Sequence, residues 1–120
     1  GINDKICQEI CDGLKRSVNL AGKTSLRESM AMLVNAKHIL GSDTGLIHAA
    51  EALGKSVTMI LGPTSVETGA GIVLPESAVI EKDVWCRPCS QNGSFPCYRE
   101  QQFCMDSIEP HDVIRSLNLD

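Results

Sequence analysis

The chain has 120 residues, of which 42% are hydrophobic and 22% are charged, with a net charge of −4. This composition fits one folded domain over residues 1–120, and no apolar run approaches the roughly 20 residues that a membrane-spanning helix needs. The isoelectric point near 5.3 argues against a nucleic-acid-binding protein, which would carry a basic excess. No Met opens the chain and no secretory signal pattern follows. Because Gly1 leads almost directly into an amphipathic segment, we expect a piece of a longer protein.

Composition divides the chain into two parts. The first 84 residues contain no Phe, Tyr or Trp, so their core must be built from aliphatic side chains. All four aromatic residues and four of the six cysteines fall in a short stretch near the end: Trp85, Cys86, Cys89, Phe95, Cys97, Tyr98, Phe103 and Cys104. We therefore expect an aliphatic α/β body and, within the same domain, a Cys/aromatic-rich segment over residues 85–106.

The first elements are read from apolar spacing and capping residues. Apolar residues at helical spacing predict a helix over 4–14, in which Cys7 and Cys11 are expected to pack in the core. A short strand is expected over 17–20. The run SLRE at residues 25–28 matches a capping box, so a helix should begin there and continue to about Lys37.

Strands and helices then alternate along the chain. A strand over 38–42 leads into a helix that begins at the DTG of residues 43–45 and ends at Gly54. A buried strand over 56–61 and a short strand over 78–81 follow, and Pro110 suits the first turn of a last helix. This alternation predicts an α/β fold with a Rossmann-like parallel sheet flanked by helices. Residues 85–106 lack backbone periodicity and are predicted to form a loop.

The stretch from Ser42 to Ala50 has the strongest functional pattern. It lies where a predicted parallel strand ends and a helix begins, which is where open α/β sheets bind ligands. The helix N-terminus would attract an anion, and the Asp43 carboxylate could accept hydrogen bonds from sugar hydroxyls. On spacing alone a simpler alternative remains, in which Asp43 only caps the helix and His48 is a partly buried core histidine.

Three segments resemble, in order, the C-terminal domain of glycosyltransferase family 9, the ADP-heptose:lipopolysaccharide heptosyltransferases. They are NLAGKTSL at residues 19–26, DTGLIHAA at 43–50 with ALG at 52–54, and GPT at 62–64. The cysteine segment, with CMD at 104–106 and IEP at 108–110, is also similar to the tail of many members. The resemblance covers nearly the whole chain.

The resemblance implies an enzyme of the GT-B type, with two Rossmann-like domains and no metal or other cofactor required for catalysis. It places the donor's diphosphate and sugar at the DTGxxH turn and the nucleoside near the GKTSL turn. Without the family context, Lys23 could equally be an exposed turn lysine. The donor-binding residues implied are Lys23, Thr24, Leu26, Asp43, Thr44, Gly45, Leu46 and His48.

The implied reaction transfers heptose or a related sugar from a nucleotide-sugar donor such as ADP-heptose to a lipid-linked saccharide acceptor of the lipopolysaccharide inner core. The resemblance implies a cytoplasmic protein, peripheral to the inner membrane. The family's acid/base residue lies in an N-terminal domain outside this chain, so no catalytic residue is expected here and the chain alone should be inactive. Residues 66–71 depart from the family's loop.

Two other functions are compatible with the residues. One is a non-catalytic, zinc-stabilised α/β module that binds a nucleotide or a protein. The other is a different nucleotide-sugar enzyme of which this chain is one half. An N-terminal acceptor domain in the longer protein would favour the heptosyltransferase over both.

The spacing of the last four cysteines allows three interpretations. Cys86 and Cys89 form a Cys-x2-Cys pair, and Cys97 and Cys104 could complete a closed tetrahedral zinc site of structural type. Two disulfides are less compatible with a reducing cytosol, and free buried thiols packing as small apolar groups are the third interpretation. If the zinc site exists, the four cysteines should lie close together with the aromatic rings around them.

Overall fold

The computed structural model describes residues 5–93 and 96–117. Among the features predicted from the sequence, Phe95 and the first residue of the 4–14 helix lie outside these ranges. The elements are α1 (Lys5–Asp12), α2 (Leu26–Asn35), β1 (Leu40–Ser42), α3 (Gly45–Ala52), β2 (Thr58–Ile60), the 3-10 turn η1 (Val66–Thr68), β3 (Ala78–Ile80), α4 (Phe103–Asp106) and α5 (Pro110–Ser116).

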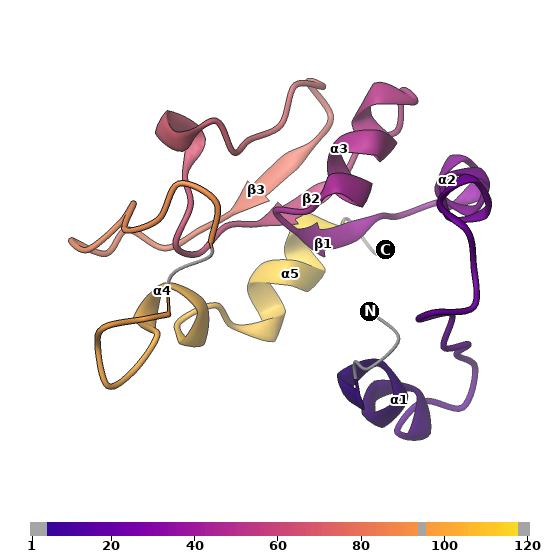
Figure 1. The fold of residues 1–120 in the computed structure, drawn as a ribbon, viewed down its shortest axis with the longest axis horizontal. Coiled ribbons are helices and arrows are strands. Elements are labelled where there is room, and N and C mark those ends of the chain that lie inside the picture. The colour runs from indigo at the N-terminus through magenta and orange to yellow at the C-terminus, as the bar shows by residue number, and fades with distance from the viewer. Residues whose placement is uncertain (1–4, 94–95, 118–120) are drawn as a thin grey trace.

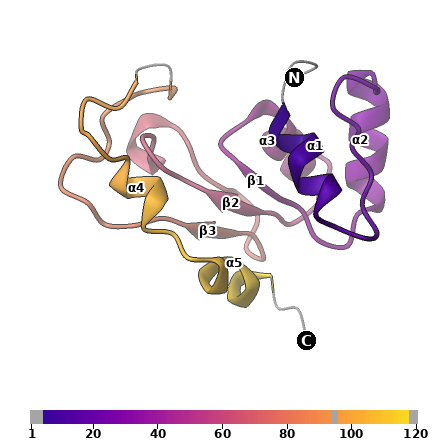
Figure 2. The ribbon, with the colours of Figure 1, turned by 90° about the horizontal axis from the view of Figure 1, so that it is seen from below.

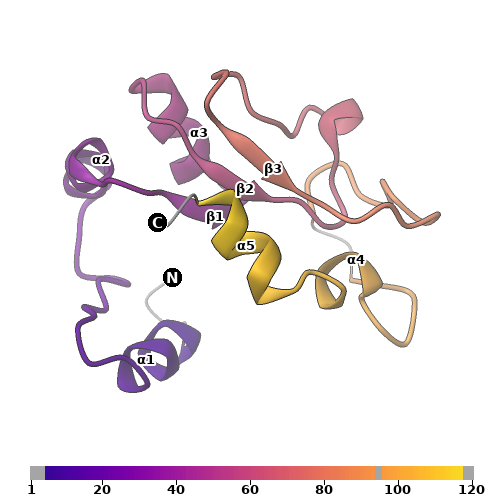
Figure 3. The same cartoon turned by 180° about the vertical axis from the view of Figure 1, so that it is seen from behind.

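The three strands form one parallel sheet in the order β1-β2-β3. Leu40 pairs with Thr58 and Thr58 with Ala78, so the three strands start and end at the same level. Helices α3 and α5 lie on opposite sides of this sheet (Figures 1 and 3). The predicted α/β fold with a Rossmann-like parallel sheet is confirmed.

The core is aliphatic, as the composition predicts, and lies between α3 and the sheet. Met59 in the central strand β2 and Leu61 just after it are fully buried. At Gly41 in β1, an added Cβ would lie 2.8 Å from the Ile47 side chain, so this glycine allows α3 to approach the strand closely. The core consists of Ile39, Ile47, Ala50, Val57, Met59, Leu61 and Ala70, with Leu33, Ala36, Ile72 and Val79 packed against it.

Several boundaries follow the local sequence signals. Ser25 and Glu28 form the predicted capping box of α2, Pro110 begins α5, and Gly54, with φ of 80°, follows the C-cap of α3. Helix α2 ends at Asn35, two residues before the predicted end.

The strand expected over 17–20 is wrong. The Asn19 side chain accepts a hydrogen bond from the Ala21 N–H at 2.9 Å, and the Lys23 N–H donates to the Leu20 carbonyl at 3.0 Å. These local bonds turn the backbone, so it cannot lie extended along β1. The sequence analysis also missed two short elements, η1 and α4, which are too short to produce a periodic pattern.

Helix α1 lies apart from the sheet (Figures 1 and 3), and none of its residues is buried. Cys7 and Cys11 are half-buried there, so the expectation that they pack in the core is wrong. The Cys-rich segment, residues 85–106, lies at the opposite end of the molecule from α1 and α2 (Figures 1 and 2). Among the described residues, no helix is long and apolar enough to cross a membrane.

Candidate functional site

A pocket of about 360 Å³ opens at the carboxyl ends of β1 and β2. Ser42 ends β1 and Ile60 ends β2, and the residues after each strand lie at the same edge because the strands are parallel neighbours. This is the edge at which open α/β sheets bind their ligands. The pocket is lined by Ser42, Asp43, Ile60, Gly62, Pro63, Thr64, Asn92, Gly93, Gln102 and Met105.

The Asp43 carboxylate joins two polar side chains at this edge, those of His48 and Thr64. One of its oxygens lies 2.7 Å from His48 Nε2, and the other accepts a hydrogen bond from the Thr64 hydroxyl at 3.2 Å. The N-cap of α3 is Thr44, so Asp43 is not the capping residue. The His48 side chain is 42% exposed, so it is not a core histidine either. Both simpler roles considered from the sequence are therefore wrong.

The N-terminus of α3 is open beside this cluster. The Thr44 side chain makes no capping hydrogen bond, and the first N–H groups of any α-helix lack intrahelical partners. Apart from its chain neighbours and the backbone of its own helix, no heavy atom lies within 4 Å of the position that a Cβ would take on Gly45. The backbone at Gly45 and Leu46 is thus accessible to an anionic group, which the helix dipole would favour.

The three residues predicted near the nucleoside lie outside the pocket that contains Asp43. Lys23 Nζ donates to the Asn19 carbonyl at 3.0 Å, the Thr24 hydroxyl lies 2.9 Å from that of Ser29, and Leu26 is 65% exposed. None of the three lines the pocket beside Asp43. Their part in nucleoside binding stays a prediction.

Thr64 and Arg87 are site residues that the sequence analysis did not select. Thr64 is buried and lies after β2, which is the neighbour of the strand that Asp43 follows, and this adjacency was the signal that could have identified it. The Arg87 side chain is only 9% exposed and donates to the carbonyls of Gly62 (2.5 Å), Lys82 (2.8 Å) and Thr64 (3.0 Å). It also pairs with Glu81 at 2.7 Å. Arg87 thereby fixes the loop that presents Thr64 to Asp43.

Glu51, on α3, is a buried carboxylate that sequence analysis also missed. It accepts hydrogen bonds from the N–H groups of Val73 and Leu74 at 3.0–3.1 Å and from the Ser77 hydroxyl at 2.7 Å. Burial alone would raise its pKa, but these hydrogen bonds and the nearby His48 together hold the pKa below its ordinary value. The ionised group ties the loop before β3 to α3.

The four cysteines of the Cys-rich segment line one small cavity of about 20 Å³. All six cysteines of the chain are free thiols, so neither of the considered disulfides is formed. Burial, with the neighbouring Cys89 and Cys86, raises the pKa of the Cys104 thiol. Over residues 5–93 and 96–117, no three Cys, His, Asp or Glu residues are grouped so that they could hold a metal ion. The zinc site stays a prediction.

The expectation that aromatic rings surround these cysteines is confirmed only in part, because Tyr98 and Phe103 line the same cavity and Trp85 does not. Trp85 and Tyr98 are 78% and 68% exposed. The Arg99 guanidinium lies 5.2 Å from the centre of the Trp85 ring and 4.4 Å from that of Phe103, and it donates to Cys86 Sγ at 3.5 Å. Cation–π contacts to Arg99 position the rings of Trp85 and Phe103, and Phe103 also lies beside the thiols.

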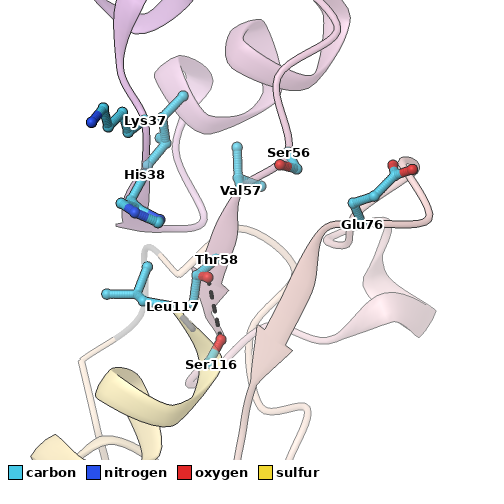
Figure 4. A pocket seen from close by; sticks show the side chains of 9 residues that line it. Lys37, His38, Ser56, Val57, Thr58, Glu76, Ser116 and Leu117 are labelled. Atoms are coloured by element: carbon cyan, nitrogen blue, oxygen red, sulfur yellow. Dashed lines mark hydrogen bonds between the residues drawn. The ribbon is translucent and has the colours of Figure 1, made fainter. Parts of the chain in front are cut away.

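A second pocket, of about 290 Å³, lies at the amino ends of the strands. Figure 4 shows Lys37 and His38 on one side of it and Glu76 on the other, with a 3.2 Å hydrogen bond between Thr58 and Ser116 below. Because ligands of parallel α/β sheets bind at the carboxyl ends, the functional site is assigned to the opposite edge.

The family model and the curated relatives that match this chain are all heptosyltransferases. The model of glycosyltransferase family 9 (heptosyltransferase) matches residues 3–98. Lipooligosaccharide heptosyltransferase 2 of Haemophilus influenzae is 35% identical over 65 residues, which is 53% of this chain and 19% of the relative. The protein of the same name from Campylobacter jejuni is 23% identical over 117 residues, which is 94% of this chain and 36% of the relative.

Lipopolysaccharide heptosyltransferase 2 of Salmonella typhimurium is 38% identical over 47 residues, or 39% of this chain and 14% of the relative. The matches thus span between about a seventh and about a third of the length of these relatives. No solved structure matches the chain significantly. Since the family model matches most of the chain, the protein belongs to glycosyltransferase family 9.

Proposed function

We propose that this chain is the donor-binding part of a GT-B glycosyltransferase that transfers heptose to the lipopolysaccharide inner core. The donor would be a nucleotide sugar, ADP-heptose or a close analogue, and the acceptor a lipid-linked saccharide. Family membership supports the reaction class, and the relatives bear heptosyltransferase names. The reaction would take place in the cytoplasm, with peripheral contact to the inner membrane.

The observation that carries the proposal is the Asp43–His48–Thr64 cluster beside the open N-terminus of α3. A nucleotide sugar combines an anionic diphosphate with a hydroxyl-rich ring. The helix N-terminus suits the diphosphate, and the leaving diphosphate gains negative charge as the sugar is transferred. The Asp43 carboxylate suits sugar hydroxyls, because an ionised carboxylate only accepts hydrogen bonds.

No residue of this chain is proposed as the acid/base that activates the acceptor. We place that residue in a separate acceptor-binding domain, so this chain alone should bind the donor without transferring the sugar. No metal or other cofactor is proposed for the chemistry. Removing a general base alone typically lowers a rate by about 10²–10⁴-fold.

The first test is a titration of isotopically labelled chain with ADP and with ADP-heptose, followed by NMR. Binding of roughly millimolar affinity should shift the amide signals of residues 43–48 and 22–26 first. Asp43→Asn should weaken ADP-heptose binding about tenfold, the loss expected for one hydrogen bond to a charged group. Asp83→Asn, an exposed carboxylate outside the pocket, is the matched control. Shifts confined to other residues would contradict the site.

The second test uses the longer protein that contains this chain. Asp43→Ala and His48→Ala should each lower kcat/KM by about 2–4 kcal/mol, roughly 30- to 1,000-fold, as expected for lost contacts to a developing charge. A longer protein that binds nucleotide but transfers no sugar would favour the non-catalytic binding module instead.

A further inference from the structure

We propose that the Cys-rich segment forms the second wall of the donor pocket and that the Gln102 side-chain amide binds the sugar of the donor. This inference rests on the proposed function and adds a specificity-determining residue to its site. It goes beyond the DTGxxH turn, of which only Asp43 lines the pocket, on the opposite wall.

The pocket has two walls that are distant in sequence. The first wall contains Ser42 at the end of β1 and the residues Asp43 and Thr64 after the strands. The second wall consists of residues of the Cys-rich segment: Asn92, Gly93, Gln102 and Met105. The two walls meet at Gly62, where an added Cβ would lie 2.5 Å from Met105 Sδ and 3.6 Å from Cys104 Sγ. A side chain at position 62 would therefore force the Met105 side chain to move, and the glycine lets the segment lie directly on the loop after β2.

The second wall is held in place by hydrogen bonds to that same loop. The N–H groups of Cys89 and Ser90 both donate to the Pro63 carbonyl, at 3.1 and 3.2 Å. The buried Arg87 guanidinium adds the bonds to Gly62 and Thr64 described above. A wall positioned in this way loses little entropy when a ligand binds, as specific recognition requires.

The charge of the pocket determines which part of the donor would bind there. Asp43 is the one ionisable residue among those that line it, and no lysine, arginine or histidine is among them. A phosphate would be repelled by this carboxylate, whereas sugar hydroxyls can donate to it. The diphosphate is thus directed to the N-terminus of α3 and the sugar to the pocket.

Gln102 is suited to recognise a sugar in this pocket. It is the N-cap of α4, and its backbone carbonyl accepts hydrogen bonds from the N–H groups of Met105 and Asp106, both at 2.9 Å, so its main chain is fixed. Its side-chain amide makes no hydrogen bond to any residue in the described part of the chain. An amide offers both donors and an acceptor, which matches a pair of neighbouring hydroxyls.

The adjacent Gln101 provides a matched control. It is exposed like Gln102 and carries the same amide, but it does not line the donor pocket. The experiment measures the affinity of the chain, Gln102→Ala and Gln101→Ala for ADP and for ADP-heptose by NMR titration. The dispersion of the remaining amide signals and the melting temperature of each variant verify that it is folded.

We expect Gln102→Ala to weaken ADP-heptose binding about 5- to 10-fold, the effect of one net hydrogen bond, and to leave ADP binding within about twofold of the unsubstituted chain. Gln101→Ala should change neither. In the unsubstituted chain, the Gln102 side-chain amide signals should shift with ADP-heptose and not with ADP.

Two results would overturn the inference in distinguishable ways. If Asp43→Asn weakens ADP-heptose binding but Gln102→Ala does not, the second wall takes no part in recognition and the proposed function stands. If the unsubstituted chain binds neither ADP nor ADP-heptose, the proposed donor site fails and the assignment of Gln102 fails with it.

Discussion

The aliphatic body and the Cys-rich segment are stabilised in different ways. In the body, Met59, Leu61 and Ala50 have no exposed surface, and parallel strand pairing fixes the backbone around them. In the Cys-rich segment, Trp85 and Tyr98 are largely exposed, and side-chain hydrogen bonds and cation–π contacts of Arg87 and Arg99 replace an apolar core. The pocket lies where the two regions meet, so donor binding would depend on both.

The two regions should lose stability in different ways when they are altered. Apolar burial stabilises the body as one cooperative unit, whereas the Cys-rich segment depends on a few polar anchors and on the state of its thiols. Changes in the body should therefore alter global unfolding, and changes in the segment should loosen it locally.

The largest expected effect is that of zinc on the Cys-rich segment. We predict that the chain binds about one zinc ion through Cys86, Cys89, Cys97 and Cys104 and that binding contributes roughly 10 kcal/mol at neutral pH. The cavity of about 20 Å³ that they line has room for one ion, but the thiols must move together to coordinate it. Because thiolates are the ligands and burial raises the pKa of Cys104, binding should weaken as the pH falls.

Elemental analysis and chelation measure this effect. Treatment with a chelator should increase hydrogen exchange over residues 85–106 while the amides of β2 stay protected. Val34→Ala, on α2 and remote from the thiols, serves as a control that should bind as much metal as the unsubstituted chain. Less than about 0.2 zinc per chain, with thiols that are ordered without metal, would contradict the prediction.

The next largest effect is expected in the body. Met59→Ala removes a fully buried side chain from the central strand and should lower the free energy of unfolding by about 2–5 kcal/mol. Met32→Ala, at a position that is 49% exposed, should change it by less than about 0.5 kcal/mol. Urea unfolding gives both values. Equal effects of the two variants would mean that the aliphatic cluster is not the core.

The sequence predicts the elements of the aliphatic body better than the contacts of the Cys-rich segment. Strands and helices of the body were predicted because buried apolar residues repeat with the period of their element, and Ser25 and Pro110 are local signals at helix starts. The pairing of Thr64 with Asp43 required knowing that β1 and β2 are neighbours. The role of Arg87 leaves no pattern in the sequence that could predict it, since most of its bonds go to backbone carbonyls between 5 and 25 residues away.

Arg87→Ala should loosen the Cys-rich segment without unfolding the body. It removes the donors to three carbonyls, so the amides of Cys89 and Ser90 should exchange about 30- to 100-fold faster, which corresponds to roughly 2–3 kcal/mol of local stability. The Leu61 amide, bonded to the Ile80 carbonyl, should keep its protection. Arg27→Ala, at an exposed position of α2, is the control. A uniform loss of protection across β2 would instead make Arg87 part of the global core.

The smallest predicted effect concerns the buried carboxylate of Glu51. Glu51→Gln keeps the shape of the side chain but replaces an acceptor-only group with an amide that cannot accept all the donors from Val73, Leu74 and Ser77. The free energy of unfolding at pH 7 should fall by about 1.5–2 kcal/mol, the value of hydrogen bonds to a charged group. Glu9→Gln, on the exposed helix α1, should have no measurable effect.

The stabilisation by Glu51 should depend on pH in a defined direction. Because the folded state lowers the pKa of Glu51 below the ordinary value of 4.5, the ionised group stabilises the fold fully above that pH. As the pH falls below 4.5 and through the folded pKa, the carboxyl takes up a proton and this stabilisation is lost. The stability difference between the unsubstituted chain and Glu51→Gln should therefore be constant near neutrality and decrease in acid. Urea unfolding over a series of pH values measures it, and a difference that grows in acid would show that the carboxylate destabilises the loop before β3.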